Sequence, residues 1–138
     1  MRSALRSIGA VIAGFLAASL VMMIVESLNG HVFFPEMGRA AQGVTDREQL
    51  RGLLAAAPVG ALLVVIVGWV LGSFAGGWLT ARLAARASVR HALVLGVLLT
   101  LAGVANNLMI PPPAWFWVLT FLAFIPAAYA GARLAPER

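Results

Sequence analysis

Long apolar stretches alternate with short polar segments along this chain. Four stretches hold almost no charged side chain, and each approaches the roughly 20 residues that a helix needs to cross a hydrocarbon core of about 30 Å. Backbone groups in lipid must bond within their own segment, and none of the stretches alternates with period two, so we expect helices rather than a β-barrel. The predicted helices cover about residues 8–28, 58–79, 92–110 and 114–132.

The overall composition agrees with a membrane protein. The chain has 138 residues, of which 62% are hydrophobic and 11% charged, whereas a soluble domain carries roughly a quarter charged residues. We therefore predict an all-α fold, with residues 1–138 forming a single membrane domain built as a four-helix bundle. The chain contains no cysteine, which excludes disulfides, thiolate metal sites and cysteine nucleophiles.

A secretory signal peptide is an alternative interpretation of the first apolar stretch. Arg2 and Arg6 precede its apolar core, and a cleavage site near Ala17–Ser19 is conceivable. However, the core runs from Ile8 to Val25, which is longer than the about 7–15 residues usual for a signal peptide. We therefore favour a retained membrane helix.

The distribution of arginine predicts the orientation in the membrane. Cytoplasmic segments next to membrane helices carry an excess of basic residues. The two termini and the second connection together hold seven arginines, whereas the first connection holds three, balanced by three acidic side chains. Both termini are therefore expected in the cytoplasm. The seven are Arg2, Arg6, Arg82, Arg86, Arg90, Arg133 and Arg138, and the three are Arg39, Arg47 and Arg51.

The outer loop at residues 29–57 is the one segment with soluble character. Pro35 disfavours helix at the preceding residue, so the chain is expected to leave the membrane in an extended form. Further on, the sequence matches a capping box, with Thr45 as N-cap and Glu48 bonding back to its amide. We therefore expect a short amphipathic helix over about residues 46–56, which lies on the outer membrane surface or caps the bundle.

Small residues recur every four positions in the first and second predicted helices. Such spacing forms a smooth face that lets another helix approach closely. The partner of the glycine face is either the first helix or a second copy of the chain, and a face opened for a substrate path is the alternative. The helix-packing residues are Gly68, Gly72, Gly76 and Gly77 in the second helix and Ala10, Gly14 and Ala18 in the first.

Five hydrogen-bonding side chains are expected to meet near the outer end of the bundle. One of them is a carboxylate inside the first apolar run, where ionisable groups are usually functional or paired. The group is interpreted as an interhelical polar clamp or as a ligand or proton site, or else its carboxylate simply reaches the headgroup region. The members are Glu26, Asn29, His31, Asn106 and Asn107.

Catalytic residues stay unknown from the sequence. A single carboxylate with one histidine is too few groups for a mechanism. Glu26 and His31 lie five residues apart, which puts them on different faces of a continuous α-helix, and Gly30 is expected to end the helix between them. The sequence holds no HExxH motif and no carboxylate pair. We therefore predict no metal site and no cofactor, and favour a protein that is not an enzyme.

Several runs of the chain form a pattern that extends over most of its length. The runs are Val25–Pro35, Leu54–Leu62, Gly68–Gly72, Gly76–Gly77, Ala105–Asn106, Ile110–Pro111 and Trp115–Trp117. In these runs the chain resembles an uncharacterised family of small bacterial integral membrane proteins with four predicted helices. The resemblance implies a location in the bacterial inner membrane, but it carries no activity.

Three classes of function stay open. We favour an accessory or scaffold subunit in the lipid bilayer, which forms a homo-oligomer or joins a larger membrane complex through the glycine face. The first alternative is a small transporter or a binder of a lipid or small solute around Glu26, and the second is a membrane enzyme. Nucleic acid is not an expected partner, since the sequence has no basic stripe with interleaved aromatic residues.

Overall fold

The described part of the chain consists of helices and the connections between them. The structure is a computed structural model that describes residues 1–84 and 88–136, and within those residues no strand occurs. Four of its six α-helices are long and apolar enough to cross a membrane, which confirms the predicted all-α bundle of four long apolar helices. The α-helices are α1 (Arg2–Leu28), α2 (Pro35–Ala41), α3 (Arg47–Ala56), α4 (Val59–Leu83), α5 (Ser88–Met109) and α6 (Ala114–Leu134).

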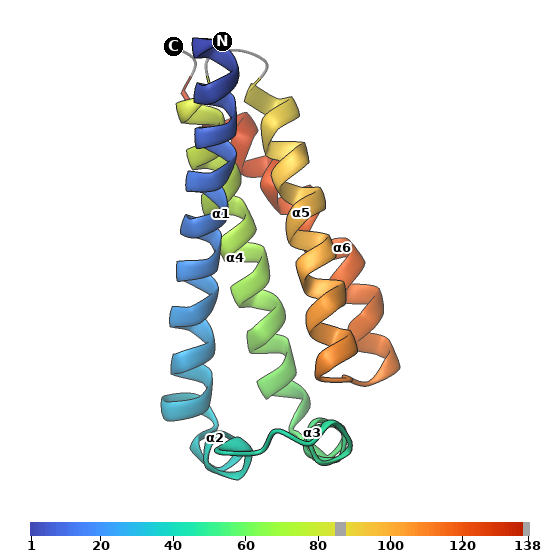
Figure 1. Cartoon of the computed structure of the whole chain (residues 1–138). Helices are drawn as coiled ribbons and strands as arrows, with labels where there is room; N and C mark the ends of the chain where they lie inside the picture. Colours follow the sequence, from blue (N-terminus) through green and yellow to red (C-terminus); the bar gives the residue numbers. More distant parts are fainter. Residues whose placement is uncertain (85–87, 137–138) are drawn as a thin grey trace.

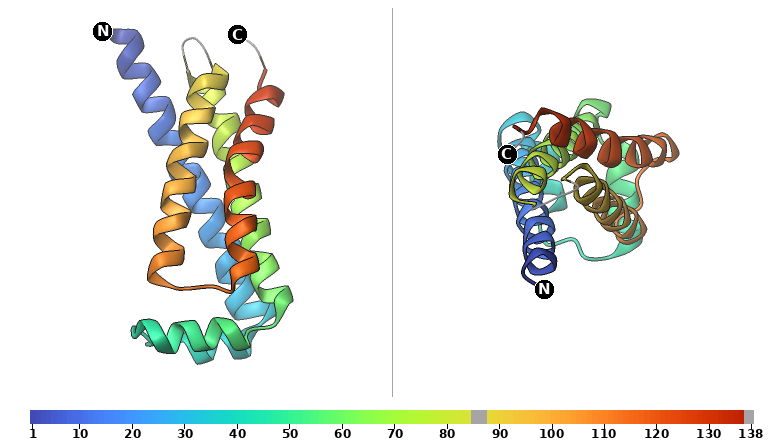
Figure 2. Two further views of the ribbon diagram at one scale, coloured as in Figure 1. Left: turned by 90° about the vertical axis from the view of Figure 1, so that its right-hand side faces the viewer. Right: turned by 90° about the horizontal axis from the view of Figure 1, so that it is seen from above.

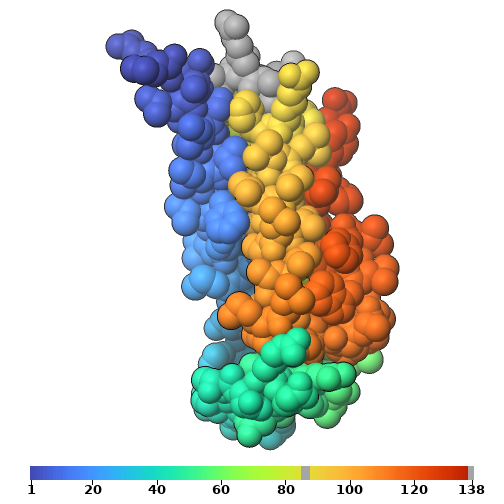
Figure 3. Space-filling view, turned by 45° about the vertical axis from the view of Figure 1, so that its right-hand side comes forward, coloured from blue at the N-terminus to red at the C-terminus, as the bar shows by residue number. Residues whose placement is uncertain are grey.

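The four long helices run side by side, and the two short ones lie across one end of the bundle (Figure 1). We call this end the α2–α3 end. The start of α1, the end of α4, the start of α5 and the end of α6 lie together at the opposite end, which we call the termini end. Side and end views show the same arrangement (Figure 2), and in the space-filling view α2 and α3 form a layer beneath the long helices (Figure 3).

The first helix is longer than the sequence predicted. It starts at Arg2 rather than near residue 8, and beyond Leu28 it continues as a π-helical segment, η1 (Asn29–Phe33). The apolar span that results, Arg2–Phe33, has 32 residues. Gly30 therefore does not end the helix, contrary to expectation. The backbone stays paired through this segment, because the Phe34 N–H donates to the Asn29 carbonyl at 2.8 Å.

The glycine face of α4 packs on α1 of the same chain. A Cβ on Gly76 would lie 2.6 Å from the carbonyl oxygen of Gly14, and a Cβ on Gly72 would lie 2.7 Å from that of Ala18. A Cβ on Gly68 would instead meet the side chain of Val25, at 2.9 Å. Two small-residue faces thus meet, and this allows the backbones to approach more closely than larger side chains would permit. The α1 residues that are buried are Ala10, Gly14 and Ala18.

Helix α4 also packs closely on α6, through a different pair of glycines. A Cβ on Gly77 would overlap the carbonyl of Ala128, and one on Gly131 would overlap that of Phe74. Nearby, the buried Trp69 stacks on Phe124, with ring centroids 5.0 Å apart. Helix α4 is therefore the central element, with α1 on one side and α6 on another.

The α2–α3 segment contains more helix than the sequence predicted. Pro35 begins α2, where the missing N–H of proline costs nothing because first-turn amides have no partner inside a helix. Helix α3 starts at Arg47, and its N-cap is Asp46, whose carboxylate accepts the Gln49 N–H at 3.0 Å. The expected cap at Thr45 was wrong, because the extended backbone of Asp46 puts its own carboxylate within reach of that amide.

Helix α3 is fixed to the bundle at both of its ends. At its start, Arg47 Nε donates to the carbonyl of Leu108 at the end of α5, at 3.0 Å. Towards its end, Leu54 packs against the main apolar core. The short amphipathic helix therefore closes one end of the bundle.

Substitution of Gly76 by alanine tests the close approach of α1 to α4. We expect Gly76→Ala to lower the free energy of unfolding by about 1–3 kcal/mol. The added methyl group would collide with the backbone of α1, so α1 would have to move away from α4. Reversible unfolding in mixed detergent micelles measures this change. The matched control is Gly9→Ala in α1, where an added Cβ meets no atom within 4 Å. Equal effects of the two substitutions would contradict the close packing.

Candidate functional site

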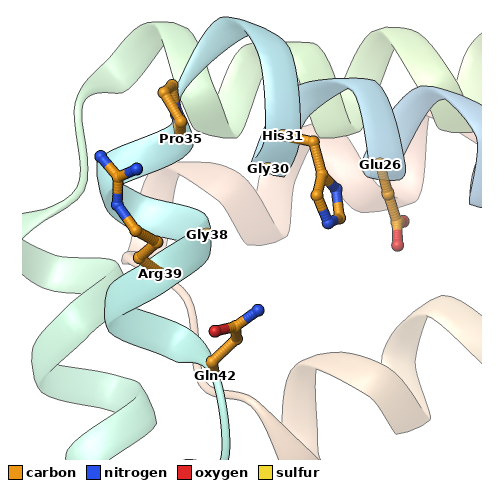
Figure 4. Close-up of a pocket in the computed structure, with 7 residues that line it drawn as sticks. All are labelled: Glu26, Gly30, His31, Pro35, Gly38, Arg39 and Gln42. Atoms are coloured by element: carbon orange, nitrogen blue, oxygen red, sulfur yellow. The ribbon is translucent and has the colours of Figure 1, made fainter.

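A pocket opens where α1, through η1, turns into α2. Its volume is about 220 Å³, which is smaller than the roughly 300–1,000 Å³ of pockets for drug-sized ligands. The pocket combines two titratable side chains with an arginine, an amide and close-packed backbone (Figure 4). The lining residues are Glu26, Gly30, His31, Pro35, Gly38, Arg39 and Gln42.

The π-helical segment explains why two residues five apart in sequence share this pocket. A π-helix bonds each amide to the carbonyl five residues earlier, so a turn takes more residues than in an α-helix. The wider turn rotates His31 toward the side on which Glu26 lies, and the two side chains point the same way (Figure 4). Their expected separation onto different faces was wrong, because it assumed α-helical spacing up to a break at Gly30.

Two glycines form the close-packed wall of the pocket. A Cβ on Gly38 would overlap the carbonyl oxygen of Gly30, so α2 packs directly on the backbone of η1. The turn between them is held by the Gly38 N–H, which donates to the Phe34 carbonyl at 3.1 Å. Side chains that extend from α2 are therefore held close to the end of α1.

Glu26 connects the pocket with the core of the bundle. One of its carboxylate oxygens accepts a hydrogen bond from Trp69 Nε1 at 3.3 Å. Trp69 is itself buried between two rings of α6, with Phe116 edge-on at 5.3 Å and Phe124 stacked at 5.0 Å. The carboxylate is directed into the pocket (Figure 4), where its second oxygen is available to a ligand.

The imidazole of His31 is oriented by its own helix. Its Nδ1 lies 2.8 Å from the carbonyl oxygen of Ser27. A carbonyl oxygen only accepts, so Nδ1 carries the proton, and in the neutral ring Nε2 is left as an acceptor. The ring points into the same space as Glu26 and the amide of Gln42 (Figure 4).

Among the described lining residues the one guanidinium group, that of Arg39, is turned away from that space (Figure 4). Arg39 forms an ion pair with Glu36, its neighbour one turn earlier on α2. Figure 4 shows its guanidinium on the far side of α2 from Gln42 and His31. The stem of Arg39 therefore lines the pocket, while its charge is already paired elsewhere.

The three other members of the predicted polar group lie outside the pocket. Asn29 is buried and its Nδ2 donates to the Ala61 carbonyl in the first turn of α4, at 2.9 Å. Asn107 is buried between α5 and α6, where its Nδ2 donates to Thr120 Oγ1 at 2.8 Å. Asn106 is exposed. The structure thus brings Glu26 and His31 together, and the two buried asparagines join helix pairs instead.

The described residues of the pocket offer groups that can bind a ligand by hydrogen bonds. They present a carboxylate oxygen, an imidazole nitrogen and an amide. Within residues 1–84 and 88–136, no three histidine, cysteine or acidic side chains gather where they could hold a metal ion. The geometry therefore provides hydrogen-bond acceptors around a small space.

Sequence reasoning missed the part of the pocket that α2 contributes. Gly38, Arg39 and Gln42 fell in the part of the outer loop for which no helix was predicted, so their approach to Glu26 was not foreseen. Two signals were available in the sequence, namely Pro35 at a position that suits the first turn of a helix, and the pair Gly30 and Gly38, which permits backbone contact.

Comparison of the chain with protein families, with curated proteins and with solved structures finds no match.

The contact between the two pocket glycines gives a second test. We expect Gly38→Ala to detach α2 from η1, because the new methyl group would occupy the position of the Gly30 carbonyl. Backbone amides over residues 30–41 should then exchange with deuterium at least about tenfold faster, for a destabilisation of about 1.4 kcal/mol or more. Hydrogen exchange read by mass spectrometry measures this rate.

The matched control for this test is Gly52→Ala on α3. Open space surrounds a Cβ at Gly52, and alanine favours helix more than glycine does. Exchange over residues 30–41 should therefore stay unchanged in that variant. Slow exchange in Gly38→Ala as well would show that α2 does not depend on the glycine contact.

Proposed function

We propose that this protein is a small integral membrane protein that binds a small polar solute or a lipid headgroup in the Glu26 pocket. The observation that carries the proposal is the convergence of Glu26, His31 and Gln42 on one small space (Figure 4). The first two are already oriented by hydrogen bonds to their own chain. Groups that are held in place before a ligand arrives lose less conformational entropy on binding.

The other functions considered for the sequence have less support. An accessory subunit was favoured by a glycine face open to a partner, and α1 of the same chain occupies that face. A membrane enzyme would need more reactive groups than one carboxylate and one imidazole. Binding therefore accounts best for the polar side chains at this end of the bundle.

We also propose that the pocket lies at the outer surface of the inner membrane. About 20 residues of helix separate Arg6 from Glu26, and at 1.5 Å per residue they span about 30 Å. This length matches the hydrocarbon core of a bilayer. With Arg6 at one interface, Glu26 reaches the headgroup level of the other.

The arginine distribution supports cytoplasmic termini. In the described residues the termini end carries more arginine than the α2–α3 end, where Glu36, Asp46 and Glu48 balance the basic residues. Arg86 and Arg138, which also entered the sequence count, lie outside the described residues. The described arginines are Arg2, Arg6, Arg82, Arg90 and Arg133 at the termini end, and Arg39, Arg47 and Arg51 at the other.

Labelling of single cysteines tests this orientation, and the natural chain offers a background free of cysteine. We expect a membrane-impermeant maleimide, added to intact spheroplasts, to modify Thr45→Cys but not Ser3→Cys, because only the first would face outward. Both positions are exposed, so both should react once the membrane is permeabilised. The reverse pattern in intact cells would contradict the proposed topology.

Native mass spectrometry of the protein released from lipid nanodiscs tests the binding function. We expect the wild-type protein to retain a bound small molecule or lipid, and Glu26→Gln to lose at least about nine-tenths of it, as for a lost charge-assisted hydrogen bond. Glutamine keeps an oxygen that can accept from Trp69, so the fold should survive.

Glu48→Gln is the matched control for the binding test. It removes one carboxylate from the same end of the chain, in an exposed pair with Arg51, and should retain the ligand fully. A wild-type protein that is always released bare, or equal retention by all three proteins, would contradict the binding function.

A further inference from the structure

We infer that the Glu26 pocket recognises a primary ammonium group, carried by a lipid headgroup or by a free amine. The inference rests on the proposed binding function and specifies the ligand. It follows from three properties of the pocket, which are its hydrogen-bonding pattern, its charge and the absence of aromatic rings from its lining.

The hydrogen-bonding groups of the pocket match the donors of an ammonium group. A primary ammonium has three N–H donors and no acceptor. The pocket offers the second carboxylate oxygen of Glu26 and the Nε2 of His31. The exposed side chain of Gln42 adds an amide, whose nitrogen faces His31 (Figure 4) and whose oxygen takes that place after a half-turn of the terminal torsion. Because Nδ1 donates to the Ser27 carbonyl, Nε2 of the neutral ring is the acceptor. The backbone carbonyl of Ser27 thus determines that His31 offers the pocket an acceptor rather than a donor.

The charge of the pocket also favours a cation. Glu26 is the one acidic residue among the described lining residues. The guanidinium of Arg39 is paired with Glu36 and turned away (Figure 4). A phosphate or carboxylate in this space would face the Glu26 carboxylate, and the described lining residues direct no cationic side chain toward it to offset the repulsion (Figure 4). An ammonium group would instead gain a charge-assisted hydrogen bond.

The lining further distinguishes a primary from a quaternary ammonium. Quaternary groups such as choline have no N–H donors and are recognised by the faces of aromatic rings. Among the described residues that line the pocket there is no phenylalanine, tyrosine or tryptophan. The volume of about 220 Å³ suits a small headgroup, and the proposed depth of Glu26 is where the amines of aminophospholipids lie.

A series of lipids that differ only in N-methylation tests this inference. Nanodiscs would hold equimolar phosphatidylethanolamine, its monomethyl and dimethyl derivatives, phosphatidylcholine and phosphatidylglycerol, and native mass spectrometry would identify the lipid that stays on the protein. We expect retention to fall with each methyl group, by about tenfold or more from phosphatidylethanolamine to phosphatidylcholine. Glu26→Gln and His31→Ala should lose the preference, and Glu48→Gln should keep it.

A second arm separates a lipid amine from a free one. The protein in phosphatidylcholine nanodiscs would be titrated with ethanolamine and, as a methylated control, with choline. Binding of ethanolamine without retention of phosphatidylethanolamine supports a water-soluble amine as ligand, and retention of the lipid supports the headgroup. Either result agrees with recognition of a primary ammonium.

Failure of the inference differs from failure of the proposed function. Retention of phosphatidylcholine or phosphatidylglycerol at the level of phosphatidylethanolamine, still lost in Glu26→Gln, would overturn the ammonium specificity and leave a binding site. Absence of any bound lipid or amine in the wild-type protein would overturn both.

Discussion

The close approach of α1 to α4 is the constraint on which the rest of the structure depends. In a bilayer, apolar side chains gain little by leaving lipid for another helix, so association relies on tight packing and on hydrogen bonds. The glycine face of α4 provides the tight packing, and hydrogen bonds between α1 and α4 are found at both ends of their interface. Arg6 Nε donates to the Leu83 carbonyl, and Asn29 Nδ2 donates to the Ala61 carbonyl. Between them, the register of α1 on α4 brings Glu26 to Trp69.

That register explains why the pocket lies at the end of the bundle. The side chain of Asn29 bonds to the first turn of α4, and beyond Asn29 the chain has to turn back toward α3. It does so without exposing unpaired backbone, through a π-helical segment followed by a helix that starts on proline. Because η1 and α2 meet at Gly30 and Gly38, the return path stays close to α1. The pocket is the space between the end of α1, η1 and α2.

Much of the fold could be predicted from the sequence, because the dominant signals are local. Apolar runs predicted the four long helices, and small residues at four-residue spacing predicted close packing of α1 and α4. The positions of the five predicted polar side chains were harder to predict, because they depend on how each helix is rotated about its own axis. Asn106 and Asn107 are neighbours, so their side chains point about 100° apart on an α-helix, and only Asn107 faces Thr120. The π-helical segment has no comparable local signal, since it reflects how the ends of α1 and α2 fit together.

The pocket and the core are linked by one carboxylate, and this link determines how well the site is prepared for a ligand. A glutamate side chain has three rotatable bonds, and fixing them costs free energy when a ligand binds. Trp69 fixes Glu26 in advance, and Trp69 is held by Phe116 and Phe124. His31 is fixed through Ser27. Gln42, at the end of α2, is exposed, and its orientation depends on the glycine contact that holds α2. Trp69 on α4 thus orients Glu26, Ser27 on α1 orients His31, and the amide of Gln42 completes the site only while α2 stays in place.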